Sequence, residues 1–460
     1  MKVRYSRGVF ARHVADESII WCPKSGGCIV MKNVQPFLSE VGMAWRDVAE
    51  IERTVANIYR IDVNEVHEDL AMVLDELQSQ RFVEFIVAEN EESIWGECSV
   101  EARLISARKE GAAQLPNEEY NSPIDDFCAR HGIVAELHID LTDACTERCV
   151  HCYVPKGQTD FLPVELAEKS LMEFRALNGL TVHLTGGEAM LHRDFERICR
   201  KCVELNLNLI IFSNMTLCDD KRIALLKDVA PQFVNVSVYS MKPEEHDAVT
   251  QLPGSWLRTI EAVSKCCAAG IPCRIATPLL KENYDALPAL RVFADQLHMH
   301  LVPAVGIVAQ ADHCCANMAH ACPIEKLRHV LARDYRLFHK SYEGVMPECG
   351  AKVCDIGIAR LYLSAKGDYY PCDSMHGYVL GNVRDNTLEQ VWRCEKLNYL
   401  RSLKNRDFGE CAACAKRPWC KVCPAANFNA TGDLLKHHPD TCIVTDVIQD
   451  VYGKVAAKGA

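Results

Sequence analysis

Three cysteines lie close together in the chain, Cys145, Cys149 and Cys152, with the spacing CxxxCxxC. They follow an apolar run, 134–141, that predicts a strand. Three thiolates on one loop can hold three corners of a 4Fe–4S cube, which leaves the fourth iron open to another molecule. A structural zinc site is the alternative, although such a site usually has two separated pairs of ligands that close a tetrahedron. The spacing therefore favours an iron–sulfur centre with one open iron.

A second set of cysteines lies in the last quarter of the chain. It has eight members: Cys349, Cys354, Cys372, Cys411, Cys414, Cys420, Cys423 and Cys442. Eight thiols are enough for two further 4Fe–4S clusters with four ligands each. Two zinc ribbons would use the same cysteines, and the spacing alone does not separate these possibilities.

The composition fits an intracellular metalloprotein. The chain has 460 residues, 25 cysteines and a formal charge of −11, with a sequence pI near 5.9. This acidic balance argues against general nucleic-acid binding, which needs a basic face. The N-terminus is polar and basic, and no apolar run approaches membrane-spanning length. We therefore expect a soluble cytoplasmic protein, without nucleic-acid or membrane partners, whose thiols stay reduced or bind metal.

Apolar runs and amphipathic stretches alternate along the middle of the chain. The apolar runs predict six strands, at 134–141, 181–185, 207–212, 233–239, 273–280 and 300–305. The intervening stretches predict helices at 163–176, 194–205, 220–229, 256–269 and 284–297. Repeated strand–helix units imply parallel strands with a site at their C-terminal ends. We therefore predict an α/β fold built on a partial (β/α)6 TIM-type barrel, because six units suit an open barrel better than eight would.

The N-terminal part, residues 1–87, has a pattern of its own. Two strand-like runs flank a turn, two stretches have helical spacing, and a third strand-like run follows, at 19–21, 28–31, 48–58, 66–77 and 81–86. The pattern predicts a small α+β domain. Residues 88–130 are polar and turn-rich and predict a linker, with a helix near 100–109.

Small and polar residues end three of the predicted barrel strands. They are Gly186, Gly187 and Glu188 after the second strand, Ser213 and Asn214 after the third, and Ser237 after the fourth. Glycines let a ligand approach the backbone closely, and a carboxylate there can accept a hydrogen bond from an ammonium group. Ordinary capping of strand–helix turns is the alternative role for these residues.

The CxxxCxxC motif, the aromatic Tyr153 after it and the Gly-Gly-Glu motif together resemble the radical S-adenosylmethionine (SAM) enzymes. The resemblance implies that SAM chelates the open iron. Its amino group would meet Gly186, Gly187 and Glu188, and its adenine would pack near His151. The family places ribose contacts at positions matching Ser213 and Asn214, and a contact to the SAM carboxylate at the position of Ser237.

The C-terminal cysteines resemble the SPASM extension of radical SAM enzymes that act on peptides. By position, Cys349, Cys354, Cys372 and Cys423 would hold the inner auxiliary cluster. The outer cluster would be held by Cys411, Cys414, Cys420 and Cys442. Two residues separate Cys420 from Cys423, where the family usually has three, so Cys423 departs from the pattern. Asp373 matches a position that can act as a base, although a turn-capping carboxylate is the alternative.

The N-terminal pattern resembles the PqqD-like peptide-recognition element of natural-product maturases, and the resemblance implies a winged-helix-like α+β domain that binds a leader peptide as an extra strand at a sheet edge. An ordinary small module that packs against the enzyme is the alternative. The expected domains are a PqqD-like domain, a linker, a radical SAM partial barrel, a helical bridge and a SPASM domain, at 1–87, 88–130, 131–310, 311–347 and 348–460.

These resemblances predict a radical SAM peptide maturase of the ranthipeptide or sactipeptide type. It would carry SAM and three 4Fe–4S clusters, one that binds SAM and two auxiliary. We expect it to bind a ribosomally made precursor peptide through its leader, and to take electrons from a donor such as flavodoxin or ferredoxin. The expected reaction is an oxidative crosslink, first of all a thioether from a cysteine sulfur to carbon. The alternatives are a carbon–carbon link, epimerisation, formylglycine-type sulfatase maturation, or a zinc-binding interaction protein without enzyme activity.

Overall fold

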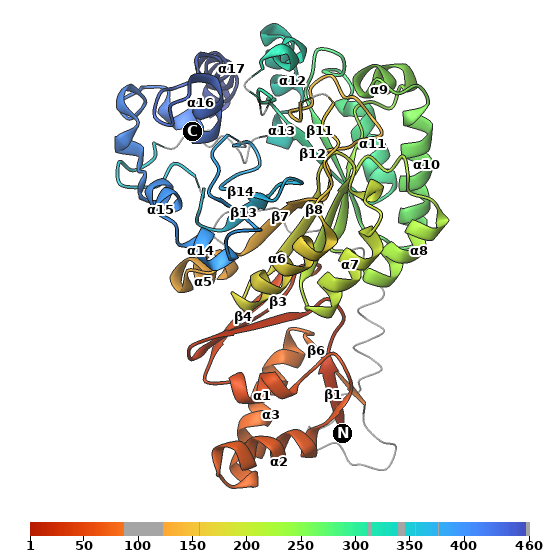
Figure 1. The fold of residues 1–460 in the computed structure, drawn as a ribbon, viewed down its shortest axis with the longest axis vertical. Coiled ribbons are helices and arrows are strands. Elements are labelled where there is room, and N and C mark those ends of the chain that lie inside the picture. The colour runs from red at the N-terminus through yellow and green to blue at the C-terminus, as the bar shows by residue number, and fades with distance from the viewer. Residues whose placement is uncertain are drawn as a thin grey trace. The chain divides into compact units, whose positions relative to one another are not determined.

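The computed structural model describes residues 1–86 and 123–456, except 156, 311, 313, 339–345, 355 and 376. Their contacts divide the chain into two compact units, Met1–Ile133 and Val134–Ala460 (Figure 1). Most of the predicted linker, including the helix expected near 100–109, lies outside the described residues. No helix in the described ranges is long and apolar enough to cross a membrane.

Residues 1–86 of the first unit form two small sheets and three helices. One sheet has the order β5-β1-β6 and the other β2-β3-β4. The strands are β1 (Lys2–Tyr5), β2 (Phe10–Val14), β3 (Glu17–Cys22), β4 (Gly27–Lys32), β5 (Arg46–Asp47) and β6 (Val83–Ile86). The helices are α1 (Gln35–Glu40), α2 (Val48–Tyr59) and α3 (Val63–Ser79). The sequence analysis found β3, β4, α2, α3 and β6 but missed β1, β2 and α1.

Helix α5 (Pro123–His131) ends the first unit. Its last residues bind Glu17 at the start of β3: Arg130 Nη1 lies 2.5 Å and His131 Nε2 lies 2.8 Å from the same carboxylate oxygen. The hydrogen bonds from His131 and Arg130 lower the pKa of Glu17 to about 2. This ion pair therefore fastens the end of the segment 88–130 to the hairpin β3–β4.

Six parallel strands in the order β12-β11-β10-β9-β8-β7 form the centre of the second unit. They are β7 (Glu136–Asp140), β8 (Thr181–Thr185), β9 (Asn208–Ser213), β10 (Phe233–Ser237), β11 (Cys273–Pro278) and β12 (His300–Ala304). The helices between them are α6 (Val164–Ala176), α7 (Phe195–Glu204), α8 (Asp220–Val229), α9 (Pro243–Thr250), α10 (Ser255–Ala268) and α11 (Leu287–Gln296). The predicted α/β fold with a partial barrel is thus confirmed, and α9 is an additional short helix.

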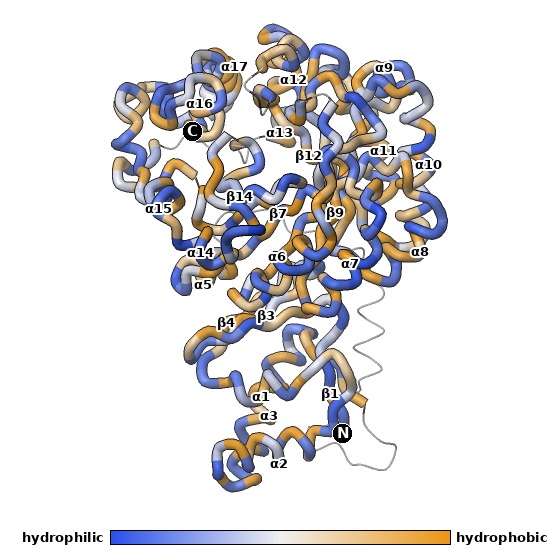
Figure 2. The backbone as a smooth tube through the Cα atoms, in the orientation of Figure 1, coloured by the Kyte–Doolittle hydropathy of each residue, from blue (hydrophilic) through white to orange (hydrophobic). Residues whose placement is uncertain are grey.

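Buried apolar residues hold the helices against the strands. Leu137 and Ile139 of β7 and Leu141 just after it are fully buried, and Leu171 and Phe174 of α6 belong to the same apolar core. Figure 2 shows the central strands mostly in the hydrophobic colours, whereas α7 and α8 alternate between hydrophobic and hydrophilic colours. Alternation in the helices and continuity in the strands are typical of a parallel sheet covered by amphipathic helices.

The C-terminal region extends the barrel sheet, which the sequence analysis did not predict. Strand β13 (Arg360–Leu363) pairs in parallel with β7, and β14 (Asp368–Tyr370) and β15 (Gly381–Asn382) follow it antiparallel. Leu361 and Leu363 are fully buried. The SPASM-like segment therefore contributes a seventh parallel strand to the barrel.

The remaining described elements are helices and single turns. They are α12 (Ile324–Arg333), α13 (Tyr335–Phe338), α14 (Leu388–Trp392), α15 (Glu395–Ser402), α16 (Pro424–Thr431) and α17 (Pro439–Ala456), with 3-10 turns at 189–191, 316–320, 405–407, 409–411 and 417–419. Helices α12 and α13 fall in the expected helical bridge. An ion pair joins Arg328 of α12 to Asp450 of α17.

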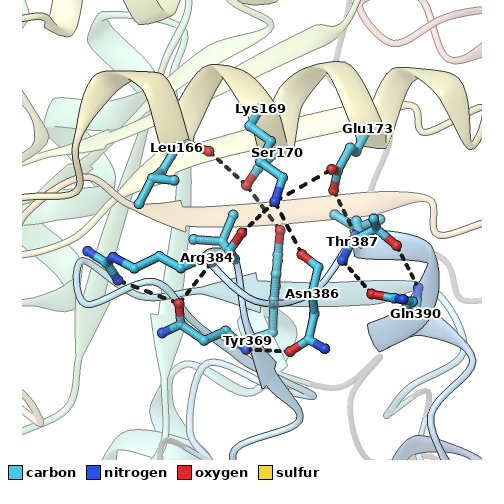
Figure 3. A network of polar contacts seen from close by, with 12 residues as sticks. Leu166, Lys169, Ser170, Glu173, Tyr369, Arg384, Asn386, Thr387 and Gln390 are labelled. Carbon is cyan, nitrogen blue, oxygen red and sulfur yellow. Dashed lines mark hydrogen bonds and ion pairs between the residues drawn. The ribbon is translucent and has the colours of Figure 1, made fainter.

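Helix α6 holds the segment between β14 and α14 through polar contacts (Figure 3). Lys169 Nζ donates to the carbonyl oxygen of Val383 at 2.6 Å, and Glu173 accepts from the backbone N–H of Leu388 at 2.7 Å. The hydroxyls of Ser170 and Tyr369 lie 3.0 Å apart in the interior. Side chains of α6 thus provide hydrogen-bond partners for the backbone carbonyl of Val383 and the backbone N–H of Leu388.

Candidate iron–sulfur and SAM site

The cysteine loop leaves the C-terminal end of β7, where the barrel pattern predicted a site. Its two ends are held together, since Asp143 N donates to Asp160 O at 2.9 Å and Leu162 N donates to Leu141 O at 3.0 Å. Backbone bonds from Arg148 and Val150 reach Thr250 and Val249 at the end of α9, at 2.9 Å each. The loop is therefore fixed to the barrel at several points along its length.

The thiols of Cys145, Cys149 and Cys152 are brought together and face buried polar groups. They lie near enough to one another that a charge on one raises the pKa of another. Burial raises the pKa of Cys145 to about 12 and that of Cys149 well above its usual value. Because a coordinated thiol is deprotonated by its metal, a bound metal ion removes this cost. No cysteine among the described residues forms a disulfide, so the donor set fits a metal cluster.

Gly186 and Gly187 need to be glycine because the cysteine loop passes directly over them. A Cβ on Gly186, whose φ is +124°, would lie 2.3 Å from Thr142 O, and one on Gly187 would lie 2.3 Å from Ala144 O. Gly187 N donates to Thr142 O at 2.7 Å. From the sequence we expected a ligand to approach the backbone of these glycines closely. In the structure the backbone of the cysteine loop occupies that place, and the glycines hold the loop in position.

Glu188 is buried and links the ends of β8 and β9. Its carboxylate accepts from Ser213 Oγ at 2.9 Å, from Asn214 N at 2.8 Å and from Met190 N at 2.9 Å. Burial raises its pKa, and the two backbone hydrogen bonds oppose that rise. The structure thus brings together three residues that were selected from the sequence, Glu188, Ser213 and Asn214. The Glu188 carboxylate holds the ends of β8 and β9 in position.

Asn214 connects the ends of the strands to the cysteine loop. Its side-chain Nδ2 donates to Thr146 Oγ1 at 2.9 Å and lies 3.6 Å from Cys145 Sγ. Its Oδ1 accepts from Thr216 N at 3.0 Å. Asn214 therefore fixes the first cysteine of the loop in relation to β9.

Tyr239 contacts three residues that were predicted from the sequence, Cys149, His151 and Ser237. The sequence analysis assigned no role to Tyr239 itself. Its hydroxyl lies 3.6 Å from Cys149 Sγ, and its ring contacts the His151 ring edge-on at 5.2 Å between centroids. Ser237 hydrogen-bonds to the same hydroxyl. The signal that could have revealed Tyr239 is its place at the end of the fourth predicted strand, two residues after Ser237.

Two buried polar atoms near the loop have no hydrogen-bond partner among the described residues, His151 Nδ1 and Glu147 Oε1. Burial lowers the pKa of His151 to about 4 and raises that of Glu147 to about 8. Buried polar groups are normally paired. These two atoms leave hydrogen-bonding capacity for a polar ligand beside the thiols.

The C-terminal cysteines form two groups. The thiols of Cys411, Cys414, Cys420 and Cys442 influence one another electrostatically, which places these four together. Cys372 and Cys423 interact in the same way. Cys423 also caps α16, where its Sγ accepts from Ala426 N at 3.4 Å. The structure therefore brings Cys423 beside Cys372 despite its unusual spacing. Cys349 is exposed and Cys354 is half-buried.

Asp373 is exposed and lies near enough to Asp140, at the end of β7, for its charge to act on that residue. Its Oδ1 accepts from Ser374 Oγ and from the Cys372 thiol, at 3.1 Å each. Its charge helps to raise the pKa of Asp140, a fully buried residue at the end of β7, to about 8, although burial is the larger cause. Asp140, which the sequence analysis missed, could have been noticed as a carboxylate inside an apolar strand.

A polar cavity of about 150 Å³ lies beside the cysteine loop. Its lining includes Asp143 and Tyr153 from the loop and Lys366 and Tyr370 from the segment β13–β14. Lys366 Nζ lies 3.8 Å from Asp160 Oδ2 at the end of the loop. The cysteine loop and the C-terminal region thus line one small cavity, and its walls carry charged groups and hydroxyls.

Comparison with known proteins identifies two domains. Residues 139–294 match the family described as the radical SAM superfamily, and residues 354–424 match SPASM, an iron–sulfur cluster-binding domain. The first match contains the CxxxCxxC and Gly-Gly-Glu motifs. The second contains six of the eight C-terminal cysteines and leaves Cys349 and Cys442 outside it.

Several relatives named for a known function match this chain at low identity. The AdoMet-dependent heme synthase of Methanosarcina barkeri is 24% identical over 65% of this chain and 94% of its own length. The PqqA peptide cyclase of Rhodopseudomonas palustris is 24% identical over 64% of this chain and 88% of its own. The subtilosin biosynthesis protein AlbA of Bacillus subtilis is 22% identical over 88% of this chain and 93% of its own.

Among solved structures, Streptococcus suis SuiB bound to its precursor peptide SuiA has the same fold. The two chains are 15% identical, with a TM-score of 0.62 over 96% of this chain and 99% of SuiB. At this identity the likeness concerns the fold alone. This chain therefore contains a radical SAM domain followed by a SPASM domain, which bind SAM and iron–sulfur clusters, and it is a radical SAM enzyme.

Proposed function

We propose that this enzyme modifies a ribosomally made precursor peptide, and that the modification is an oxidative crosslink from a cysteine sulfur to carbon. The observation that carries the proposal is the extent of the likeness. AlbA and SuiB align with 88% and 96% of this chain, whereas the heme synthase aligns with 65%. The relatives that match nearly the whole chain are thus a bacteriocin biosynthesis protein and an enzyme that binds a precursor peptide.

In this proposal Cys145, Cys149 and Cys152 hold the SAM-binding 4Fe–4S cluster. The Asn214 amide and the Tyr239 hydroxyl lie beside these sulfurs, where they can stabilise thiolate ligands by donating to them. SAM would occupy the space bordered by His151, Gly186, Gly187, Glu188, Ser213, Asn214 and Ser237. SAM held there would supply the radical chemistry that removes a hydrogen atom from the peptide, and the residues around it would hold it against the cluster.

The C-terminal cysteines would hold two auxiliary 4Fe–4S clusters. Cys349, Cys354, Cys372 and Cys423 would bind the inner one, and Cys411, Cys414, Cys420 and Cys442 the outer one. Forming a carbon–sulfur bond from a carbon radical and a thiol releases one electron and one proton. The auxiliary clusters can accept the electron, and Asp373, which lies beside Cys372 and acts on Asp140 of β7, can accept the proton.

The first unit would bind the leader of the precursor. It has strand edges available for an added strand, since β2 and β4 are the outer strands of their sheet. The polar cavity beside the cysteine loop would receive part of the core peptide. An external donor such as flavodoxin or ferredoxin would reduce the SAM-binding cluster.

The test is an anaerobic reaction of the reconstituted enzyme, SAM and dithionite with candidate precursors, which are short reading frames next to its gene. A thioether removes two hydrogen atoms per crosslink and one thiol that iodoacetamide can label. A carbon–carbon link loses the same mass but keeps the thiol, and epimerisation leaves the mass unchanged while it takes up deuterium from heavy water. Formylglycine formation converts a cysteine or serine to an aldehyde. Peptide-independent 5′-deoxyadenosine formation with no altered peptide would overturn the proposal.

A further inference from the structure

The polar cavity beside the cysteine loop carries more negative than positive charge. Asp143 and Asp312 line it, and Lys366 is the one cation in the described part of its lining. The Lys366 ammonium already faces two carboxylates, since it acts on Asp143 and lies 3.8 Å from Asp160 Oδ2. One ammonium cannot neutralise both of these carboxylates and Asp312 as well, so the cavity has an unmet negative charge.

A buried carboxylate, Asp140 at the end of β7, adds to this charge. It is 2% exposed, and its Oδ1 has no hydrogen-bond partner among the described residues. Leu137 and Ile139 of the same strand belong to the apolar core that β7 shares with α6. Because side chains alternate along a strand, Asp140 points to the other face of the sheet, away from that core.

Two observations place the Asp140 carboxylate beside the cavity. Leu363 of β13 is the register partner of Ile139, so Ser364, which lines the cavity, lies next to Asp140. The charge of Asp140 also acts on the hydroxyls of Tyr153 and Tyr370, which are further lining residues. The unpaired oxygen of Asp140 is therefore available to a group that enters the cavity.

An ionised Asp140 is costly while the cavity holds no cation. Burial, assisted by the charges of Asp143 and Asp373, raises the pKa of Asp140 to about 8. A buried charge without a partner is unfavourable, and a cation within hydrogen-bond reach offsets that cost. The cavity is therefore built to gain from a positively charged ligand.

The spacing of the carboxylates fits an organic cation better than a metal ion. Among the described residues, no three ligand atoms beside this cavity lie within 4.8 Å of one another. An ammonium or guanidinium group carries several N–H donors that point in different directions, so it can reach acceptors that are further apart. Val154 and Pro155 add an apolar part to the lining, which suits a methylene stem.

We propose that this cavity binds a basic side chain, lysine or arginine, of the peptide on which the enzyme acts, and that Asp140, Asp143 and Asp312 select for it. The inference rests on the proposed function, because it takes the cation to be part of a peptide substrate. The charged end of the side chain meets the three carboxylates, and its stem packs on Val154 and Pro155. A peptide with a neutral or acidic residue at that place forfeits these contacts.

The experiment measures binding without turnover. The reconstituted enzyme, with SAM and without reductant, is titrated calorimetrically with N-acetyl-lysine N-methylamide and with the arginine analogue, at millimolar concentrations. The neutral counterparts are the norleucine and citrulline derivatives, which have nearly the same shape. We expect the basic probes to bind, and the neutral ones to bind at least about tenfold more weakly, since they lose a charge-assisted hydrogen bond.

Variants of the enzyme assign the binding to this cavity. Asp140→Asn should weaken binding of the basic probes at least about tenfold and leave the neutral probes unaffected. Its iron content reports whether the fold is kept, and Asp143→Asn replaces it if iron is lost. A matched control is Asp228→Asn, which removes an exposed carboxylate paired with Arg200 on the surface and should bind the probes as wild type does.

The outcomes separate this inference from the proposed function. Absence of binding, equal binding of basic and neutral probes, or unchanged binding in the cavity variants would overturn the cation site, even if a crosslinked peptide is found. Binding that depends on Asp140, with no candidate peptide altered under reducing conditions, would leave the cation site standing and overturn the proposed function instead. If only the lysine or only the arginine probe binds, that result names the side chain.

Discussion

The two cysteine-rich regions hold their thiols in different ways. In the barrel, the loop of Cys145 to Cys152 bonds to distant parts of the chain: Arg148 N reaches Thr250 O, and Glu188 N reaches Ala144 O. In the C-terminal region the turns bond mainly to themselves. Cys414 N donates to Cys411 O and Cys420 N to Arg417 O. The barrel loop is therefore ordered by the fold, whereas the outer cysteine group depends far more on whatever its thiols bind.

This difference suggests two roles for metal. A site fixed by long-range backbone bonds keeps its shape when the metal leaves, as a catalytic centre that exchanges ligands must. A site built from local turns gains much of its order from the metal, since metal binding and folding are then coupled. The predictions below compare the two regions, beginning with the largest effect.

The largest expected effect is the loss of SAM cleavage while the protein keeps its fold. We expect Cys145→Ala/Cys149→Ala/Cys152→Ala to abolish 5′-deoxyadenosine formation and to remove about four irons from a total near 12, given four irons per cubane. The thermal midpoint should fall by only a few degrees, because the loop's backbone bonds remain. Anaerobic iron and sulfide analysis with differential scanning calorimetry measures both. A global loss of structure would contradict the assigned role of the loop.

The matched change in the C-terminal region is Cys411→Ser/Cys414→Ser, and here the expected effect is on stability. Without its metal, the segment 405–442 should lose protection from hydrogen exchange by about 100-fold, or about 2.8 kcal/mol at 1.4 kcal/mol per decade. The protection of backbone amides in β7, β8 and β9 from hydrogen exchange should not change. Equal protection in this variant and in wild type would show that the C-terminal turns are ordered by packing alone.

An effect on stability of similar size is expected in the barrel from Glu188→Ala, which leaves the hydroxyl of Ser213 and the N–H of Asn214 buried without their acceptor. Each unpaired group costs about 1–3 kcal/mol. Urea denaturation should therefore show a loss of about 2–5 kcal/mol, with weaker SAM binding. The control is Glu168→Ala, which breaks a surface ion pair with Arg197 and should cost within about 1 kcal/mol.

Much of the barrel could be predicted because its signals are local. Runs such as 181–185 and 220–229 have their period and their boundaries in the sequence, and β8 and α8 cover the same residues. Strand β13 could not be found in this way. It has four residues, and its partner β7 lies more than two hundred positions earlier, so only the tertiary fold makes it a strand.

The site was predicted where residue types carry the signal and missed where long-range contacts do. The three cysteines and Glu188 were selected by spacing, but nothing local indicates that Glu188 accepts from Ser213 and Asn214. The partners of Tyr239 and Asp140 depend in the same way on which strand ends meet. The acidic cavity could not be recognised because Asp140 and Ser364 become neighbours only through the pairing of β7 with β13.

The smallest expected effect tests the electrostatic link between the two regions. Asp373 of the C-terminal region and Asp143 help burial to raise the pKa of Asp140 from about 3.9 in an unfolded chain to about 8. Because the folded protein favours protonated Asp140, this residue lowers the stability progressively as the pH rises from about 4 to about 8. Removing the Asp373 charge should lower the pKa of Asp140 and make this decline smaller.

The measurement is urea denaturation of Asp373→Asn between pH 5 and pH 8.5, compared with Asp140→Asn. Asp140→Asn should remove the share of the decline that Asp140 contributes, since asparagine has no charge to bury, whereas Glu147, whose pKa burial also raises to about 8, keeps its own share. Asp373→Asn should remove only part of it, because burial, the larger cause, remains. If Asp373→Asn left the decline unchanged, Asp373 would not act on the barrel interior, and its assignment as a proton acceptor facing the substrate would have to be abandoned.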